Sequence, residues 1–181
     1  LEEFVSELSQ RLEVLGQDSQ FVEQLQSSLS NDERFMLFVH SCFERVYKEY
    51  EKEKFKAYKE AFIRGLTDSS LTIDMKLAFI QMLDRMGPVD LHVLAHLSTL
   101  PPDSYMRADA IMEAVSDQSA EQRLLVLSAT DTLANLQLIE VGRIGLDEDS
   151  FLHRERHDYK LTALGRCLVD FIGGHALEAP D

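Results

Sequence analysis

A short strand that leads directly into a helix, near the C-terminal end of the sequence, constrains the fold most. Tyr159 and Leu161 point to one face of the strand and Lys160 to the other, because successive side chains alternate. We expect the two apolar side chains to be buried. Thr162 can cap the following helix with its hydroxyl, and Gly165 lets that helix approach its neighbours closely. The stretch therefore predicts a strand and a helix packed against one core.

Helix formers dominate the composition of the chain. Its 181 residues include only eight glycines and four prolines, and 45% of them are hydrophobic. Such a chain can bury a core of useful size, and it favours helices over strands and turns. We expect a mainly α protein of one or two compact domains.

The N-terminal part of the sequence predicts three helices. Apolar residues recur at helical spacing in residues 3–15 and 19–29, which indicates two short amphipathic helices. No helix breaker follows until Gly65, which is placed to end a helix. We therefore expect one long helix over about residues 32–65, with a length of about 50 Å at 1.5 Å per residue.

The long helix is expected to be charged in its middle. A capping box between Ser30 and Glu33 marks its start. Its apolar pattern lapses at Glu51–Lys54, where opposite charges lie three residues apart and can pair. Mixed charges of this kind favour a solvated face, and a protruding arm used for self-association is the alternative.

A domain boundary is expected where two helix signals meet. Asp74 can cap a helix that ends at Gly87, and Pro88 suits the first turn of the next helix. The predicted units are a helical domain with the long arm helix (1–87), a second domain (88–174) and a flexible tail (175–181).

The second domain is expected to combine helices with a pair of strands. Its predicted elements are a helix from Leu91, a helix over Arg107–Val115, a helix from a capping box at Ser119 to about Gln137, a strand over Leu138–Val141, a polar wing over Gly142–His157, a returning strand over Tyr159–Leu161 and a closing helix over Ala163–Ile172.

This order resembles that of winged-helix domains, a helix-turn-helix variant. Leu133–Ile139 looks like the end of a recognition helix, and Tyr159–Arg166 is similar to the wing-to-helix junction of MarR-type and PadR-type regulators. Phe79–Leu94 looks like a segment of uncharacterised bacterial proteins that join a helical region to a winged helix. The resemblance implies a winged helix with a two-stranded β wing, and a possible role in transcription regulation.

The charge of the chain disfavours nucleic acid as a partner. The net charge is -14, of which residues 1–87 contribute -5 (16 acidic, 11 basic) and residues 88–181 contribute -9 (16 acidic, 7 basic). DNA binding draws much of its free energy from Lys and Arg at phosphates. The more acidic half, which holds the expected winged helix, is therefore poorly suited to binding DNA.

If the third helix of the second domain does read DNA, polar side chains on it and arginines in the wing supply the contacts. The candidates for these contacts are Gln122, Arg123, Asn135, Arg154 and Arg156. The acidic run Asp147–Asp149, expected near the tip of the wing, would be repelled by phosphate.

Neither a cofactor nor a metal site is expected. His92 and His96 lie four residues apart on a helix, but no glutamate occupies position 93, so the zinc-protease motif is absent. Cys42 and Cys167 lie in apolar helical patterns, which favours two buried free thiols over a disulfide. The sequence contains no phosphate-cradling glycine loop and no nucleophile elbow, so we do not expect an enzyme.

The expected location is the cytoplasm, with no membrane association. The longest nearly apolar run, Phe35–Phe43, is too short to span a bilayer, and no signal peptide is visible. Because the sequence opens on Leu1 rather than on Met, we expect an N-terminal segment to be missing.

Two hypotheses for the function follow from these observations. The first is a non-enzymatic protein-interaction or regulatory module, oligomeric, in which the winged helix serves as a packing platform and the long helix as an arm. The second is a DNA-binding transcriptional regulator of winged-helix type. The charge and the burial of the exposed face of the third helix distinguish the two hypotheses.

Overall fold

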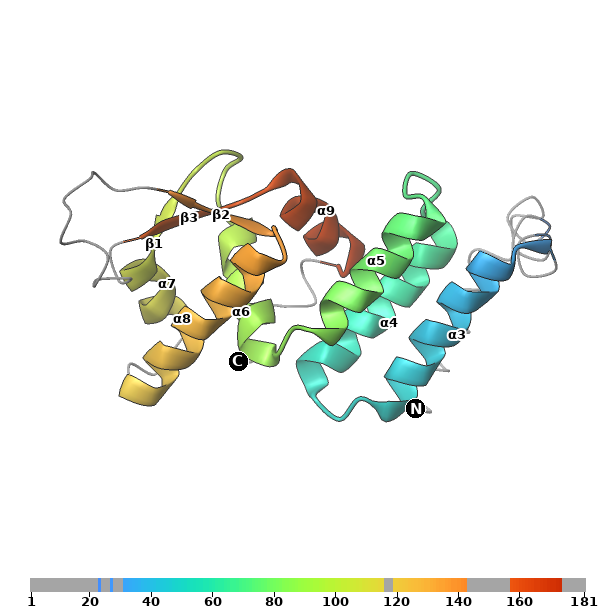
Figure 1. Cartoon of the computed structure of the whole chain (residues 1–181), viewed down its shortest axis with the longest axis horizontal. Helices are drawn as coiled ribbons and strands as arrows, with labels where there is room; N and C mark the ends of the chain where they lie inside the picture. The colour runs from blue at the N-terminus through green and yellow to red at the C-terminus, as the bar shows by residue number, and fades with distance from the viewer. Residues whose placement is uncertain (1–22, 24–26, 28–30, 116–118, 143–156, 174–181) are drawn as a thin grey trace.

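Seven helices and a small antiparallel sheet make up the described part of the chain in this computed structural model, which comprises residues 23, 27, 31–115, 119–142 and 157–173. The helices are α3 (Glu33–Lys48), α4 (Lys52–Thr67), α5 (Ile73–Asp84), α6 (Pro88–Ser98), α7 (Ala108–Val115), α8 (Ala120–Asn135) and α9 (Ala163–Phe171), and the strands are β1 (Met106–Arg107), β2 (Ile139–Gly142) and β3 (Asp158–Leu161) (Figure 1). The prediction of a mainly helical protein is confirmed.

The single long helix predicted over residues 32–65 is wrong. The helix ends at Lys48, and Glu49 and Glu51 adopt extended backbone angles before α4 begins. The carboxylate of Glu49 accepts hydrogen bonds from the backbone N–H groups of Tyr50 and Glu51, each over 3.0 Å, so it supports the turn. Side chains that bind nearby backbone in this way compete with helical hydrogen bonds.

The turn is favoured because it lets both helices bury their apolar faces. Phe38 and Cys42 of α3 and Tyr58 of α4 are buried in the same core, which a straight helix would have kept apart. Burial of this much apolar surface outweighs charge pairs worth a few tenths of a kcal/mol each. Gly65 does not end the helix as predicted. It lies within α4, where a Cβ atom would come 2.0 Å from Cζ of Phe38.

Three of the described helices begin at a hydroxyl side chain. Thr72, Ser119 and Thr162 cap α5, α8 and α9 by accepting a hydrogen bond from the backbone N–H three residues later. The caps at Ser119 and Thr162 were predicted, whereas α5 begins at Thr72 rather than at Asp74. Helix α3 is capped by Asp32, and Ser30, the predicted cap, lies outside the described residues.

The sheet has the strand order β1–β3–β2, and both pairs are antiparallel. The sequence predicted β2 and β3 but not β1, whose two residues are too few to show an alternating pattern. In β3, Tyr159 and Leu161 are 4% and 3% exposed, so their predicted burial is confirmed. Lys160 lies on the opposite side, with its ammonium 4.9 Å from the centre of the Tyr105 ring.

The strand–helix junction joins the sheet to α9 at very close range. A Cβ atom at Gly165 would lie 2.1 Å from the backbone oxygen of Leu138, so only glycine permits this approach. The hydroxyl of Thr162 also donates to the backbone oxygen of Gln137 over 2.7 Å. The predicted roles of Thr162 and Gly165 are therefore confirmed.

A continuous core runs through the described helices and the sheet. It crosses the predicted boundary at Gly87, where the rings of Phe79 and Phe171 lie 5.4 Å apart. The division into domains 1–87 and 88–174 stays a prediction, and the predicted tail at 175–181 lies outside the described residues. Cys42 is buried as predicted, but Cys167 is exposed on α9, so the prediction of two buried thiols is wrong for Cys167.

Candidate functional site

The polar residues predicted to contact DNA do not gather on one face of α8. Gln122 is half-buried, whereas Arg123 and Asn135 are exposed. Because successive helical residues are about 100° apart, the three side chains point in three different directions around the helix. Arg154 and Arg156, the wing candidates, lie outside the described residues.

The outward face of α8 carries apolar and acidic side chains instead. Leu124 and Leu125 are 67% and 49% exposed, although the opposite side of the same helix is buried against α6 and α7. We define the α8 outer face by its exposed residues Glu121, Leu124, Leu125, Ser128, Asp131 and Asn135. None of these residues is basic, and two of them are acidic. A surface of this kind suits contact with a protein better than contact with phosphate.

The exposure of the two leucines was not predicted from the sequence, although the spacing of the buried residues in α8 indicates it for Leu124. The buried positions Val126, Ala129 and Leu133 recur at a spacing of three and four residues, which fixes the core side of α8. Leu124 does not fit that spacing, so it should have been expected on the opposite side. Leu125 lies four residues before Ala129, so the spacing alone would have placed it beside the core.

The cations beside the sheet are engaged by nearby acids. Lys160 lies 3.3 Å from the carboxylate of Glu140, and Arg166 lies 3.9 Å from that of Asp103. The hydroxyl of Tyr105 donates to Glu140 over 3.0 Å, and contacts with Tyr105 and Glu140 raise the pKa of Lys160. These two positive charges are therefore balanced within the chain, which reduces what they can offer to phosphate.

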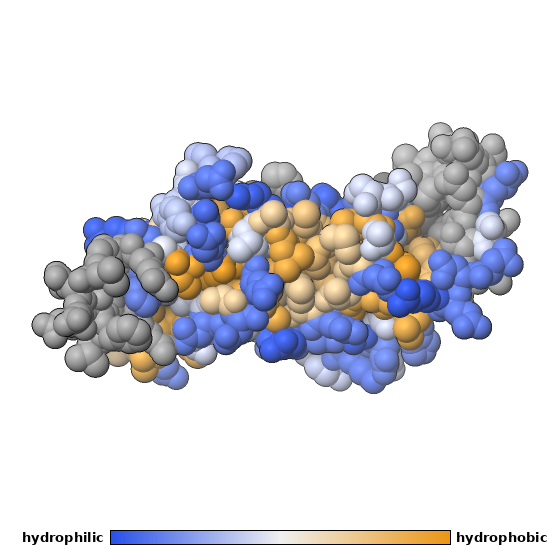
Figure 2. Space-filling model, turned by 45° about the horizontal axis from the view of Figure 1, so that its top comes forward, coloured by the Kyte–Doolittle hydropathy of each residue, from blue (hydrophilic) through white to orange (hydrophobic). Residues whose placement is uncertain are grey.

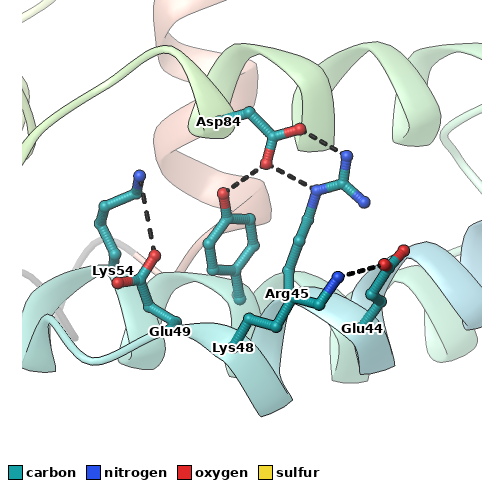
Figure 3. A pocket seen from close by; sticks show the side chains of 7 residues that line it. Glu44, Arg45, Lys48, Glu49, Lys54 and Asp84 are labelled. Atoms are coloured by element: carbon teal, nitrogen blue, oxygen red, sulfur yellow. Dashed lines mark hydrogen bonds and ion pairs between the residues drawn. The ribbon is translucent and has the colours of Figure 1, made fainter.

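A pocket of about 310 Å³ opens between α3, α4 and the end of α5 (Figure 3). It is lined by Glu44, Arg45, Lys48, Glu49, Lys54, Tyr58 and Asp84. At its centre, Asp84 Oδ1 accepts hydrogen bonds from Arg45 Nε and from Tyr58 Oη, each over 2.6 Å. A carboxylate at the end of α5 thus connects α3 with α4.

The protonation states in this pocket follow from the same contacts. Burial opposes ionisation of Asp84, but the hydrogen bonds from Arg45 and Tyr58 outweigh it and hold the pKa of that carboxyl below its ordinary value. Burial raises the pKa of the Tyr58 hydroxyl, and the hydrogen bond to Asp84 raises it further. Asp84 is therefore ionised and Tyr58 neutral near pH 7.

The chemistry of the pocket fits a structural role. Lys48 lies 2.5 Å from Glu44, and Lys54 lies 3.7 Å from Glu49, so every lining side chain has a partner in the pocket. A general base or a nucleophile needs a side chain that can leave its partners for a substrate. The described lining offers none, and we assign the pocket to fixing the three helices.

The histidine pair of α6 is not part of a metal centre in the described residues. His92 and His96 are both half-buried, His92 Nε2 is buried without a hydrogen-bond partner, and burial lowers the pKa of His96. No group of three or more His, Cys, Asp or Glu side chains that could hold a metal ion occurs in the described ranges.

Apolar side chains also reach the surface away from α8. On the face shown in Figure 2, hydrophobic residues form a band along the molecule, with hydrophilic residues on both of its long sides. Large exposed apolar residues also occur on α3, among them Met36, Phe43 and Tyr47. Within the described ranges, no helix has both the length and the apolar character needed to cross a membrane.

Comparison with known proteins yields no relative from which a function could be transferred. No protein-family model, no curated protein and no solved structure matches this chain. The proposed function therefore rests on the surfaces described above.

Proposed function

We propose that the chain is a non-enzymatic protein-interaction module in which a winged helix serves as a packing platform. The contact surface is the α8 outer face. The observation that carries the proposal is the exposure of Leu124 and Leu125 between acidic residues, with no basic residue on the same face. Exposed apolar groups of this kind on a structured helix are characteristic of interaction sites.

The order of the elements supports a winged helix. Three helices (α6, α7 and α8) are followed by the strand pair β2–β3 and the closing helix α9, which is the order that the resemblance implies. In that layout α8 is the helix that would face a nucleic acid. Here its outward face is suited to a protein that supplies apolar side chains over the leucines and basic side chains near Glu121 and Asp131.

DNA binding is the second candidate function. It is supported by the same order of elements and by the exposure of Arg123 and Asn135 on α8, since Arg and Asn are suited to reading base edges. The net charge of -9 in residues 88–181 opposes it.

Site-specific photo-crosslinking in cells tests the interaction surface. A photoreactive amino acid at position 125 should give a discrete protein adduct, and Leu124→Glu should reduce its yield at least several-fold. The matched control places the same amino acid at Ser69, an exposed residue of the connection between α4 and α5. Equal adducts from both positions, or none from position 125, would contradict the proposal.

A titration with DNA tests the second candidate. Fluorescence anisotropy with mixed-sequence duplex DNA at low salt gives electrostatic binding its best chance. We expect no binding at micromolar protein. Binding that Arg123→Ala weakens, and that Leu124→Glu leaves unchanged, would favour the DNA-binding regulator instead.

A further inference from the structure

Helix α3 has an apolar stripe that is separate from the face it buries in the core. Met36, Phe43 and Tyr47 are 46%, 43% and 73% exposed, and His40 is exposed between them. We define the α3 stripe as these four residues. Its spacing of four, three and four residues is that of the a and d positions of a coiled coil, which form a straight seam along one side of a helix.

The α3 stripe is held in place by the rest of the fold. Phe38, Cys42 and Val46, on the other side of α3, lie in the core at 0%, 0% and 3% exposure. The ring of Phe43 rests edge-on against Phe62 of α4, with ring centres 4.9 Å apart. A rigid surface loses little conformational entropy on binding, so the α3 stripe is ready to bind another helix.

The α3 stripe is complementary to itself in an antiparallel arrangement. If a two-fold axis passes between His40 and Phe43, Met36 of each copy meets Tyr47 of the other. His40 and Phe43 then meet in the same way, and one patch serves both copies, as a symmetric dimer requires. Contact of a methionine sulfur with an aromatic ring is favourable, which supports the pairing of Met36 with Tyr47.

The charges at the two ends of α3 favour the same direction. The first turn carries Glu33 next to Arg34, and the last turn carries Arg45 and Lys48, so an antiparallel pair brings Glu33 near the more basic end of the other copy. A parallel pair would place Glu33 beside Glu33 and Lys48 beside Lys48. The helix dipoles also attract each other in the antiparallel arrangement and repel each other in the parallel one.

We propose that the α3 stripe binds the α3 stripe of a second copy of this chain, antiparallel, about an axis between His40 and Phe43. The inference deepens the oligomeric part of the proposed function and does not need the α8 outer face. Helices α3 and α8 lie at opposite ends of the elongated molecule (Figure 1), so a dimer formed through α3 leaves both α8 outer faces accessible.

Sedimentation equilibrium with matched variants tests the surface. We expect a reversible dimer at micromolar concentrations, and Tyr47→Glu should raise its Kd at least tenfold. The control is Tyr50→Glu, the same change three residues later at a 96% exposed residue beyond the end of α3. An unchanged Kd in Tyr47→Glu, or an equal rise in both variants, would overturn the proposal.

Disulfide crosslinking tests the direction and the register. In a Cys167→Ser background, a mixture of Met36→Cys and Tyr47→Cys chains should form a mixed dimer under mild oxidation. Met36→Cys alone should not, because its two copies would lie about 16 Å apart along the helix axis at 1.5 Å per residue. Rapid crosslinking of Met36→Cys alone would overturn the antiparallel register.

A chain that remains monomeric at about 100 µM would overturn dimerisation through the α3 stripe, since this concentration lies well above the micromolar Kd expected for the dimer. The stripe would then be covered by residues 1–30 of the same chain or by another protein. Whether the chain is a monomer or a dimer does not affect the photo-crosslinking from position 125, which tests the α8 outer face. Failure of this inference can therefore be distinguished from failure of the proposed function.

Discussion

Two polar side chains, one of them buried, tie helices together at single residues. The ammonium of Lys76, which is 7% exposed, donates to the backbone oxygens of Gly65 and Asp68 over 2.8 and 2.6 Å. It thereby satisfies carbonyls that the end of α4 leaves without an intrahelical partner. Asp84 has a similar role between α3 and α4. Removing one partner of such a contact costs more than the contact itself contributes.

The role of Asp84 predicts a dependence of stability on pH. Its folded-state pKa lies below the ordinary value, so its contribution is present above about pH 4, where an unfolded Asp is ionised, and is lost as pH falls through the folded-state pKa. Asp84→Asn should therefore lower the urea midpoint at pH 7, and this difference should shrink as pH falls below about 4. Urea unfolding of both proteins across this range checks the prediction.

Asp74→Asn is the control for this prediction. Asp74 pairs with Arg34 at an exposed site, with side chains 61% and 64% exposed, and exposed pairs contribute little to stability. We expect its urea midpoint to follow that of the parent chain at every pH. An Asp84→Asn difference that does not shrink as pH falls below about 4 would mean that the carboxylate charge is not what holds the helices.

At the level of elements, the close approach of α3 to α4 depends on Gly65. Gly65→Ala should improve the helix propensity of α4 by about 1 kcal/mol. However, the new methyl group would meet the Phe38 ring, which is fully buried and cannot move aside. We expect a net loss of about 1–3 kcal/mol in the free energy of unfolding, as overpacking typically costs. Chemical denaturation measures it.

A second substitution separates overpacking from other effects of Gly65→Ala. Phe38→Leu removes part of the ring that the methyl group would meet, so the double variant should be more stable than the sum of the two losses predicts. Additive losses would show that the methyl group does not meet Phe38.

Some elements could be predicted because their signals are local. The caps at Ser119 and Thr162, the helix start at Pro88 and the close approach at Gly165 each follow from a few neighbouring residues. The break at Glu49 could not be predicted this way. The charged stretch is compatible with a helix, and only the distant packing of α4 on α3 decides against one.

The candidate sites also divide into features that a local sequence pattern predicts and features that depend on packing between distant residues. Leu124 could have been placed outside from the spacing of its buried neighbours, because that spacing is a property of one helix. The contact of Asp84 with Arg45 joins residues 39 positions apart, and that with Tyr58 joins residues 26 apart. No local pattern links these positions, so the pocket appears only once the three helices have packed.

At the scale of the whole molecule, the uneven charge agrees with the proposal of different partners for the two ends. Residues 1–87, which hold α3, carry a net charge of -5, whereas residues 88–181, which hold α8, carry -9. Two copies repel each other least when the less acidic ends meet. The more acidic end is better suited to a basic partner. This arrangement supports self-association through α3 and a different protein at α8.

The charge also predicts how salt changes each kind of association. Two copies with a net charge of -14 each repel one another, and raising the salt from about 0.01 to 0.1 M shortens the range of that repulsion from about 30 to 10 Å. The contact between α3 stripes is mainly apolar and is not screened. We therefore expect the Kd of the dimer to fall several-fold over this range, as measured by sedimentation equilibrium.

Binding to DNA would have the opposite dependence, because added salt removes the free energy gained from released counterions. Anisotropy titrations with duplex DNA in the same buffers therefore provide the contrast. A dimer Kd that rises with salt would mean that end pairs such as Glu33 with Lys48 hold the copies together. In that case Lys48→Glu should weaken the dimer more than Tyr47→Glu does, and the apolar stripe would not be the main contact.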